Sequence, residues 1–134
     1  MGRGAQGEEA LTSAEIAALR SWLGLSRPEL AVKLGVSERT IRYWEAGQTR
    51  PYAENVERLR AAVAEADDLV EKLVAEALAG DGTVLTPIDG DERGSAGWWQ
   101  MIGARCMAAN PQIRVRDWWF TFDAPTRRHT TEGV

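Results

Sequence analysis

The sequence predicts a mainly α-helical protein with a small mixed α and β region toward its C-terminal end. Three observations predict this fold class. Helix-capping patterns recur in the first part of the chain, a long apolar seam at helical spacing follows, and short apolar segments bounded by glycine and proline come last. At 134 residues, the chain has room for one domain of ordinary size or two very small ones.

Two capping boxes predict the first two helices. In Thr12-Ser13-Ala14-Glu15, the threonine and the glutamate can each satisfy a free backbone N–H group at a helix start, and apolar residues follow at helical spacing. We expect this helix over residues 13–23. Ser26-Arg27-Pro28-Glu29 repeats the pattern with a proline in the first turn, and Gly35 ends the second helix, over residues 27–34.

A third short helix is expected over residues 38–46. Ser37 is a favourable N-cap, and Gly47 supplies the stop. Ile41 and Trp44 fall on one face, which we expect to be core. Two short helices joined by a tight turn that contains glycine, inside a bundle of small helices, form the helix-turn-helix pattern.

One long helix is predicted over residues 53–79, because apolar residues recur there at alternating steps of three and four. The seam residues are Val56, Leu59, Val63, Ala66, Val70, Leu73 and Ala77. We expect this seam to take part in self-association. The alternative is that it packs only against the chain's own remaining elements.

The last third of the chain predicts strand, helix and strand. We expect a strand near residues 83–88, which Pro87 confines to an edge, then a polar loop "DGDERG" and a helix over residues 96–109. The segment "IRVRDWWFTF" first alternates and then becomes apolar on both faces, as a partly covered strand does. We expect a second strand there.

Charge is distributed unevenly along this acidic chain, whose net charge is −4. Residues 13–60 carry eight basic against six acidic side chains, whereas residues 61–92 carry one basic against nine acidic side chains. Binding depends on which face presents which charge, so a net acidic chain can still carry a nucleic-acid site.

Composition argues against metal, thiol and membrane chemistry. Cys106 and His129 are the single cysteine and histidine, so we expect neither a metal site nor a cofactor. No apolar run approaches the roughly 18 residues of a membrane span, and the N-terminus lacks the apolar stretch of a secretory signal. We therefore expect a cytoplasmic protein with no membrane partner and no evident small-molecule substrate.

From Leu11 to about Leu59 the sequence resembles the helix-turn-helix domain of the lambdoid phage repressors and the related XRE-type bacterial regulators. The matching residues are "LRSWLGLSRPELAVKLGVSERTIRYWEAGQTRP". With the long helix, the strand and a closing helix that begins "GW", the layout is similar to the anti-CRISPR-associated autorepressors, in which the C-terminal part makes the dimer. The resemblance implies a homodimeric repressor that binds double-stranded DNA and regulates its own operon.

In a helix-turn-helix, the second helix enters the major groove and its N-terminal residues meet base edges. Arg39 is the first candidate for readout, because arginine can bond to both O6 and N7 of guanine. Glu38 either accepts from a cytosine amine or orients a neighbouring arginine, and Tyr43 either contacts the DNA or is a solvated rim residue. The base-reading candidates are Ser37, Glu38, Arg39, Arg42 and Tyr43.

Other candidates lie where this fold meets phosphates, where its helices meet each other and where two copies would join. The phosphate candidates are Arg27, Thr40, Gln48, Thr49 and Arg50. The resemblance implies a partly buried ion pair between Arg20 and Glu45, which ties the first helix to the recognition helix. The dimer-interface candidates are Val70, Leu73, Val84, Leu85, Trp98, Trp99, Ile102 and Cys106. For the tryptophans, a domain core or a ligand or RNA surface are the alternatives.

We therefore expect a flexible N-terminus over residues 1–11, a DNA-binding domain over 12–60, a dimerisation region over 61–123 and a disordered tail over 124–134. Two-fold symmetry implies an inverted-repeat operator. The alternatives are the antitoxin of a toxin-antitoxin pair and a regulator that also binds its own mRNA. An enzyme is not expected, because no nucleophile, base and orienting group can be assembled from these residues.

Overall fold

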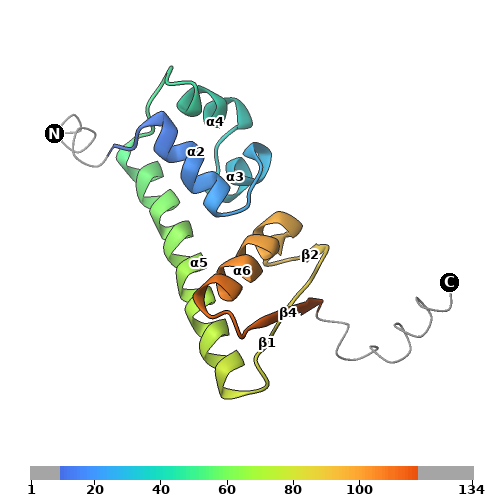
Figure 1. Ribbon diagram of the computed structural model, residues 1–134. Helices are drawn as coiled ribbons and strands as arrows, with labels where there is room; N and C mark the ends of the chain where they lie inside the picture. The colour runs from blue at the N-terminus through green and yellow to red at the C-terminus, as the bar shows by residue number, and fades with distance from the viewer. Residues whose placement is uncertain (1–9, 118–134) are drawn as a thin grey trace. The chain divides into compact units, whose positions relative to one another are not determined.

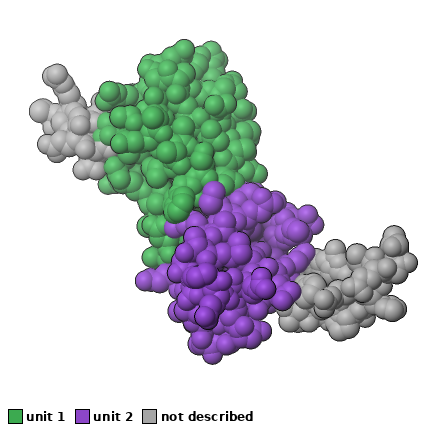
Figure 2. Space-filling view, viewed as in Figure 1, with its two compact units in different colours: residues 1–68 green, residues 69–134 purple. Residues whose placement is uncertain are grey.

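The computed structural model describes residues 10–117 and confirms the predicted mainly α fold class (Figure 1). The chain divides into two compact units, residues 1–68 and residues 69–134 (Figure 2). Most of the expected flexible N-terminus and all of the expected disordered tail lie outside the described residues. Within the described part, no helix has both the length and the apolar composition to cross a membrane.

Three short helices and the first part of a long one form the described part of the first unit. The short helices are α2 (Ser13–Trp22), α3 (Arg27–Leu34) and α4 (Glu38–Glu45), and the long one is α5 (Ala53–Ala79). Thr12 and Ser26 start α2 and α3 with the two capping boxes expected from the sequence. The observed bounds differ from the predicted ones by at most one residue.

The turn between α3 and α4 depends on Gly35, which adopts the left-handed conformation with φ 73°. Because a side chain disfavours that conformation, glycine is the residue that fits here. The next N–H group, of Val36, donates to the carbonyl of Ala31 at 3.0 Å and closes the end of α3. Ser37 then starts α4 by accepting the N–H group of Thr40 at 3.1 Å. This three-residue connection sets the angle at which α4 leaves α3.

A shared apolar core holds the four helices of the first unit together. Helices of eight residues are not stable alone in water, so tertiary packing must stabilise α3 and α4. Each Leu or Ile side chain that becomes fully buried contributes about 1.5–3 kcal/mol. The largest core side chains, all at most 4 % exposed, are Ile16, Leu23, Leu30, Leu34, Ile41, Trp44, Val56 and Leu59.

The N-terminal half of α5 belongs to the first unit and contacts α3. Arg58 donates from Nη1 to the carbonyl of Leu34 at 3.3 Å, and Lys33 forms an ion pair with Glu65 at 3.2 Å. Both contacts tie α5 to α3. The compact unit consequently reaches residue 68, eight residues past the end predicted for the DNA-binding domain.

In the second unit, a parallel strand pair is joined by a helix. Strand β1 (Thr83–Thr86) pairs with β4 (Arg114–Asp117), with Val84 opposite Val115. Parallel strands need a long crossover, and this one contains α6 (Ala96–Ala109). Residues 118–122, the remainder of the expected second strand, lie outside the described residues.

The segment predicted as a polar loop contains a short antiparallel pair, β2 (Gly90–Asp91) and β3 (Gly94–Ser95). Asp91 holds this turn together. Its Oδ1 accepts hydrogen bonds from the backbone N–H groups of Arg93 at 2.9 Å and Gly94 at 3.2 Å. The same oxygen accepts a hydrogen bond from the Nε1–H group of Trp99 at 2.9 Å. The prediction was wrong here, because a run of charged residues normally indicates a solvated loop. In this segment one carboxylate folds the turn over the start of α6.

The core of the second unit is built on α6. Trp98 and Trp99 pack edge to face with centroids 4.8 Å apart, and Cys106 is fully buried. Burial raises the pKa of the Cys106 thiol, which fits its role as a small core side chain. Gly103 lets α6 approach β4 closely, since a Cβ atom there would lie 3.1 Å from Cγ1 of Val115.

We expect Gly94→Ala to lower the free energy of unfolding by about 1 to 3 kcal/mol, as overpacking of a well-filled core does. A Cβ atom at this position would overlap the ring of Trp98, which is only 4 % exposed and cannot move aside easily. Urea denaturation followed by circular dichroism measures the change. Gly80→Ala is the matched control, because a Cβ atom there would come no closer than 3.5 Å to a neighbouring atom. Equal stabilities for the two variants would contradict the packing described for Trp98.

Candidate nucleic-acid interface

Helix α4 divides the candidate residues between a core face and a solvent face. Ile41 is fully buried and Trp44 is 4 % exposed, so these two side chains fix the rotation of the helix. Glu38, Arg39 and Arg42 are exposed, while Tyr43 is half-buried. The candidate base-reading side chains therefore gather on the face that the core leaves free.

Two pairs of side chains, each one helical turn apart, order this solvent face. Arg42 donates from Nη1 to Oε2 of Glu38 at 3.0 Å, so Glu38 makes the arginine-orienting contact that was one of its two predicted roles. Arg39 donates from Nε to the hydroxyl of Tyr43 at 2.8 Å, and its Cζ lies 5.3 Å from the centre of the tyrosine ring. Neighbours on the helix thus hold both arginines before any ligand binds.

The hydroxyl groups of Ser37 and Thr40 are used to start α4. Ser37 Oγ accepts the N–H group of Thr40 and lies 2.9 Å from the Thr40 hydroxyl. Capping a helix N-terminus is worth about 1 kcal/mol. Any contact of these residues with DNA must therefore be compatible with the cap.

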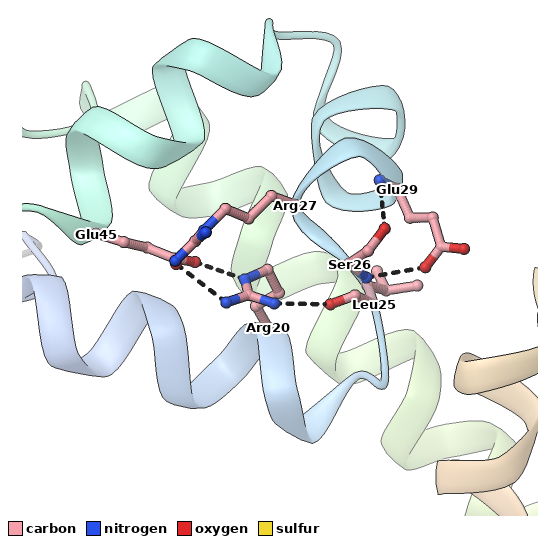
Figure 3. A network of polar contacts seen from close by, with 6 residues as sticks. All are labelled: Arg20, Leu25, Ser26, Arg27, Glu29 and Glu45. Atoms are coloured by element: carbon pink, nitrogen blue, oxygen red, sulfur yellow. Dashed lines mark hydrogen bonds and ion pairs between the residues drawn. The ribbon is translucent and has the colours of Figure 1, made fainter.

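Glu45, at the C-terminal end of α4, accepts hydrogen bonds from two arginines. Arg20 of α2 donates from Nε at 2.6 Å and from Nη2 at 3.0 Å to its two carboxylate oxygens, which is the ion pair that the family resemblance implied. The same guanidinium donates from Nη1 to the carbonyl of Leu25 at 3.1 Å (Figure 3). Only 5 % of the Glu45 side chain and 19 % of the Arg20 side chain remain exposed. The pair is therefore partly buried.

The second partner of Glu45 is Arg27, which was expected only at a phosphate. Its Nε lies 2.9 Å from Oε1 of Glu45, and 47 % of its side chain is exposed. Sequence reasoning missed this contact, because capping patterns say nothing about where the side chain of the first helical residue turns. The three side chains come from α2, α3 and α4 and carry one negative and two positive charges.

The environment of Glu45 keeps it ionised. Burial by itself raises the pKa of this carboxyl group, but the hydrogen bonds and charges of Arg20 and Arg27 outweigh that effect and lower the pKa below its ordinary value of 4.5. The hydrogen bond with Glu45 in turn raises the pKa of Arg20. Glu45 and Arg20 are therefore both charged at neutral pH.

The remaining phosphate candidates, Gln48, Thr49 and Arg50, are exposed and follow the end of α4. The N–H groups of Gln48 and Thr49 donate to the carbonyl of Tyr43 at 2.9 and 3.4 Å, which folds the chain back over the helix end. Side chains on this turn lie next to the recognition helix in sequence and in space. A polyanion bound at the exposed face of α4 would also lie near this turn.

Residues 13–73 match the family model of a helix-turn-helix domain. Helices α3 and α4, joined by the turn at Gly35, form the helix-turn-helix region of the described structure. No curated protein matches the chain. The helix-turn-helix domain supports a DNA-binding regulator over an enzyme. The match covers α2 to α4 and most of α5, which agrees with the packing of α5 in the first unit.

The structure places most of the dimer-interface candidates inside the chain's own core. Five of them are at most 4 % exposed: Val84, Trp98, Trp99, Ile102 and Cys106. Val70 and Leu73 are half-buried, and Leu85 is 37 % exposed. Their role in self-association stays a prediction. Among the described residues of the second unit, the large apolar side chains that are exposed are Leu78, Leu85, Ile88 and Met107, and of these only Leu85 was an interface candidate.

We expect Glu45→Gln to lower the free energy of unfolding at pH 7 by about 1 to 3 kcal/mol, between the values typical of exposed and buried ion pairs. The pKa of Glu45 is lowered by folding, so the stabilisation is present above pH 4.5 and is lost as the pH falls below that value. The difference between wild type and Glu45→Gln should therefore shrink between pH 5 and pH 3. Urea denaturation at each pH measures it.

The matched control is Glu65→Gln, because Glu65 also pairs with a basic residue but keeps 59 % of its side chain exposed. We expect it to cost less than about 1 kcal/mol at pH 7. A Glu45→Gln protein as stable as the wild type at pH 7 would show that the arginine network does not hold the helices together.

Proposed function

We propose that the protein is a homodimeric transcriptional repressor that binds an inverted-repeat operator and regulates its own operon. The observation that supports DNA recognition best is the division of α4, where Ile41 and Trp44 fill the core while Glu38, Arg39, Arg42 and Tyr43 lie on the other side. In a helix-turn-helix, that exposed face is the one that enters the major groove.

Base recognition is assigned mainly to Arg39. Its guanidinium group carries donors at the spacing of guanine O6 and N7, and a good bidentate contact of this kind discriminates by about 1 to 3 kcal/mol. Arg42 is paired with Glu38, so part of its charge is already neutralised. Arg39 is held by a neutral tyrosine and keeps its full charge for the DNA.

Backbone contacts are assigned to residues at the ends of α3 and α4. Arg27 begins α3 and is nearly half exposed, while Gln48, Thr49 and Arg50 are exposed after α4. Thr40 lies within the first turn of α4. Such contacts fix the register of the domain and make affinity fall with salt, with a slope of about −0.9 per phosphate neutralised.

Self-association is assigned to the second unit. Ile88 and Met107 are 56 % and 46 % exposed, and both line a mostly apolar hollow of about 270 Å³ that also includes Gly103 and Val115. Exposed apolar side chains gathered around one hollow favour an interaction site. A second copy of the chain is the proposed occupant, because a helix-turn-helix repressor gains affinity when two copies bind two half-sites.

We expect Arg39→Ala and Arg50→Ala to affect DNA binding in different ways. A preferred duplex is first selected from a random pool with the wild-type protein. Arg39→Ala should then lose about 1 to 3 kcal/mol of discrimination at one guanine, because the base contact is removed. Arg50→Ala should weaken binding to all sequences alike and reduce the salt slope by about one phosphate.

Fluorescence anisotropy with matched and mismatched duplexes at several salt concentrations separates the two effects. Arg39 is proposed to read a base and Arg50 to contact a phosphate. An Arg39→Ala protein with unchanged discrimination, together with an Arg50→Ala protein that has lost it, would contradict this assignment of roles. A wild-type protein that selects no sequence at all would contradict the proposed function.

We expect the wild-type chain to sediment as a dimer, at twice the 14.8 kDa mass of one chain. Ile88→Asp should shift the population toward the monomer, because it places a charge at the apolar hollow. Val32→Asp is the control, since Val32 is 83 % exposed in the other unit. Analytical ultracentrifugation measures both variants. An Ile88→Asp protein that remains as dimeric as wild type would remove this surface from the interface.

A further inference from the structure

We infer that Tyr43 is a positioning residue for base recognition. Its hydroxyl group holds the Nε edge of Arg39, so that Arg39 presents only its Nη1–Nη2 edge to a guanine. This inference rests on the proposed DNA-binding function and deepens it. It names the edge of the arginine that reads the base and the side chain that selects this edge.

The contact between the two residues is geometrically well formed. Arg39 and Tyr43 lie one turn apart on α4, and the Nε–H group of Arg39 donates to the hydroxyl oxygen at 2.8 Å. The guanidinium carbon is 5.3 Å from the ring centre, within range of a cation–π contact. Both interactions act on the same guanidinium group and favour one orientation.

Tyr43 is the better fixed member of the pair. It is half-buried, whereas Arg39 is exposed, and its own carbonyl accepts the N–H groups of Gln48 and Thr49. A tyrosine side chain also has only two rotatable angles, whereas an arginine side chain has more and loses more rotamer entropy when it is held. Tyr43 therefore restrains Arg39, and the entropy lost on DNA binding becomes smaller.

The chemistry of guanidinium explains why the restraint selects one edge. An arginine can approach guanine O6 and N7 either with Nε and one terminal nitrogen or with its two terminal nitrogens. The first approach needs the Nε–H group, which Tyr43 already occupies. Only the second remains, and it directs the side chain end-on toward the base.

Arg42 shows why Tyr43 is suited to this task. Glu38 orients Arg42 by a direct ion pair at 3.0 Å. The negative charge of the Glu38 carboxylate would also repel a polyanion that approaches Arg42. The tyrosine hydroxyl is neutral, so it orients Arg39 without cancelling its charge. Two arginines on one face are thus held by different partners, and Arg39 is the one that is both ordered and fully charged.

The test compares Tyr43→Phe with Tyr52→Phe on the selected duplex and on variants changed at the guanine that Arg39 reads. Tyr43→Phe keeps the ring and removes one hydrogen bond, so discrimination at that guanine should fall about fivefold. The chain has two tyrosines, and Tyr52, 68 % exposed at the start of α5, is the matched control, for which we expect no change. Arg39→Ala should lose about 5- to 150-fold, and adding Tyr43→Phe to it should cause no further loss.

A second measurement needs no DNA. In the free protein, the Nε–H signal of Arg39 should exchange with water more slowly than those of unpaired arginines, and Tyr43→Phe should remove this protection. Arg39→Lys assigns the signal by its disappearance. The Tyr52→Phe protein should keep the protection.

Distinct outcomes overturn distinct statements. If Tyr43→Phe discriminates like the wild type while Tyr43→Ala does not, the ring itself contacts the DNA and the positioning role is wrong. The role is equally wrong if Tyr43→Phe weakens binding further in the Arg39→Ala background, because the hydroxyl then acts independently. A wild-type protein that binds no preferred sequence overturns the proposed function and this role together. If the wild-type protein selects a sequence, and discrimination at the guanine falls in Tyr43→Phe but not in Tyr52→Phe, both are supported.

Discussion

The carboxylate of Glu45 is the constraint on which the placement of α4 depends. It accepts from Arg20 and Arg27, so one buried negative charge joins three helices that are each too short to be stable alone. The apolar core sets how tightly α4 packs, but apolar contacts are non-directional. The bidentate pair with Arg20 adds a direction, because its two hydrogen bonds form in only one relative placement of α2 and α4.

The charges near Glu45 show why the net acidity of the chain does not exclude a site for a polyanion. The charges of Glu45 and its two arginine partners sum to one positive charge. The arginines on α4 and after it add further positive charge in the same region of the sequence. The excess of acid lies elsewhere, between residues 61 and 92, largely on exposed positions of α5. Within a screening length of about 10 Å, the local arginines outweigh the net charge of the whole chain.

The sequence predicted those parts of the fold that local chemistry determines. Ser37, Gly35 and the two capping boxes fixed the helix bounds, since each satisfies backbone groups within a few residues of itself. It did not predict the second bond of Glu45, the parallel pairing of β1 with β4 or the turn around Asp91. The first two join residues distant along the chain, and the turn depends on the rotamer of the partly buried Asp91 side chain; no spacing rule records that information. For the candidate site, the face of α4 was predicted, whereas the pairing of Arg39 with Tyr43 was not.

The burial of the tryptophans changes how the second unit can associate. Trp98 and Trp99 fill their own core, and the indole of Trp99 is fixed by Asp91 and covered by Arg93, whose Cζ lies 4.7 Å from the ring centre. Exposing these rings to reach another chain would break that hydrogen bond and lose about 3 to 5 kcal/mol of core packing. An interface built from Ile88 and Met107 has no such cost, because both side chains already face solvent. The tryptophans therefore stabilise the fold of the unit itself, whereas Ile88 and Met107 are available to join two copies of the chain.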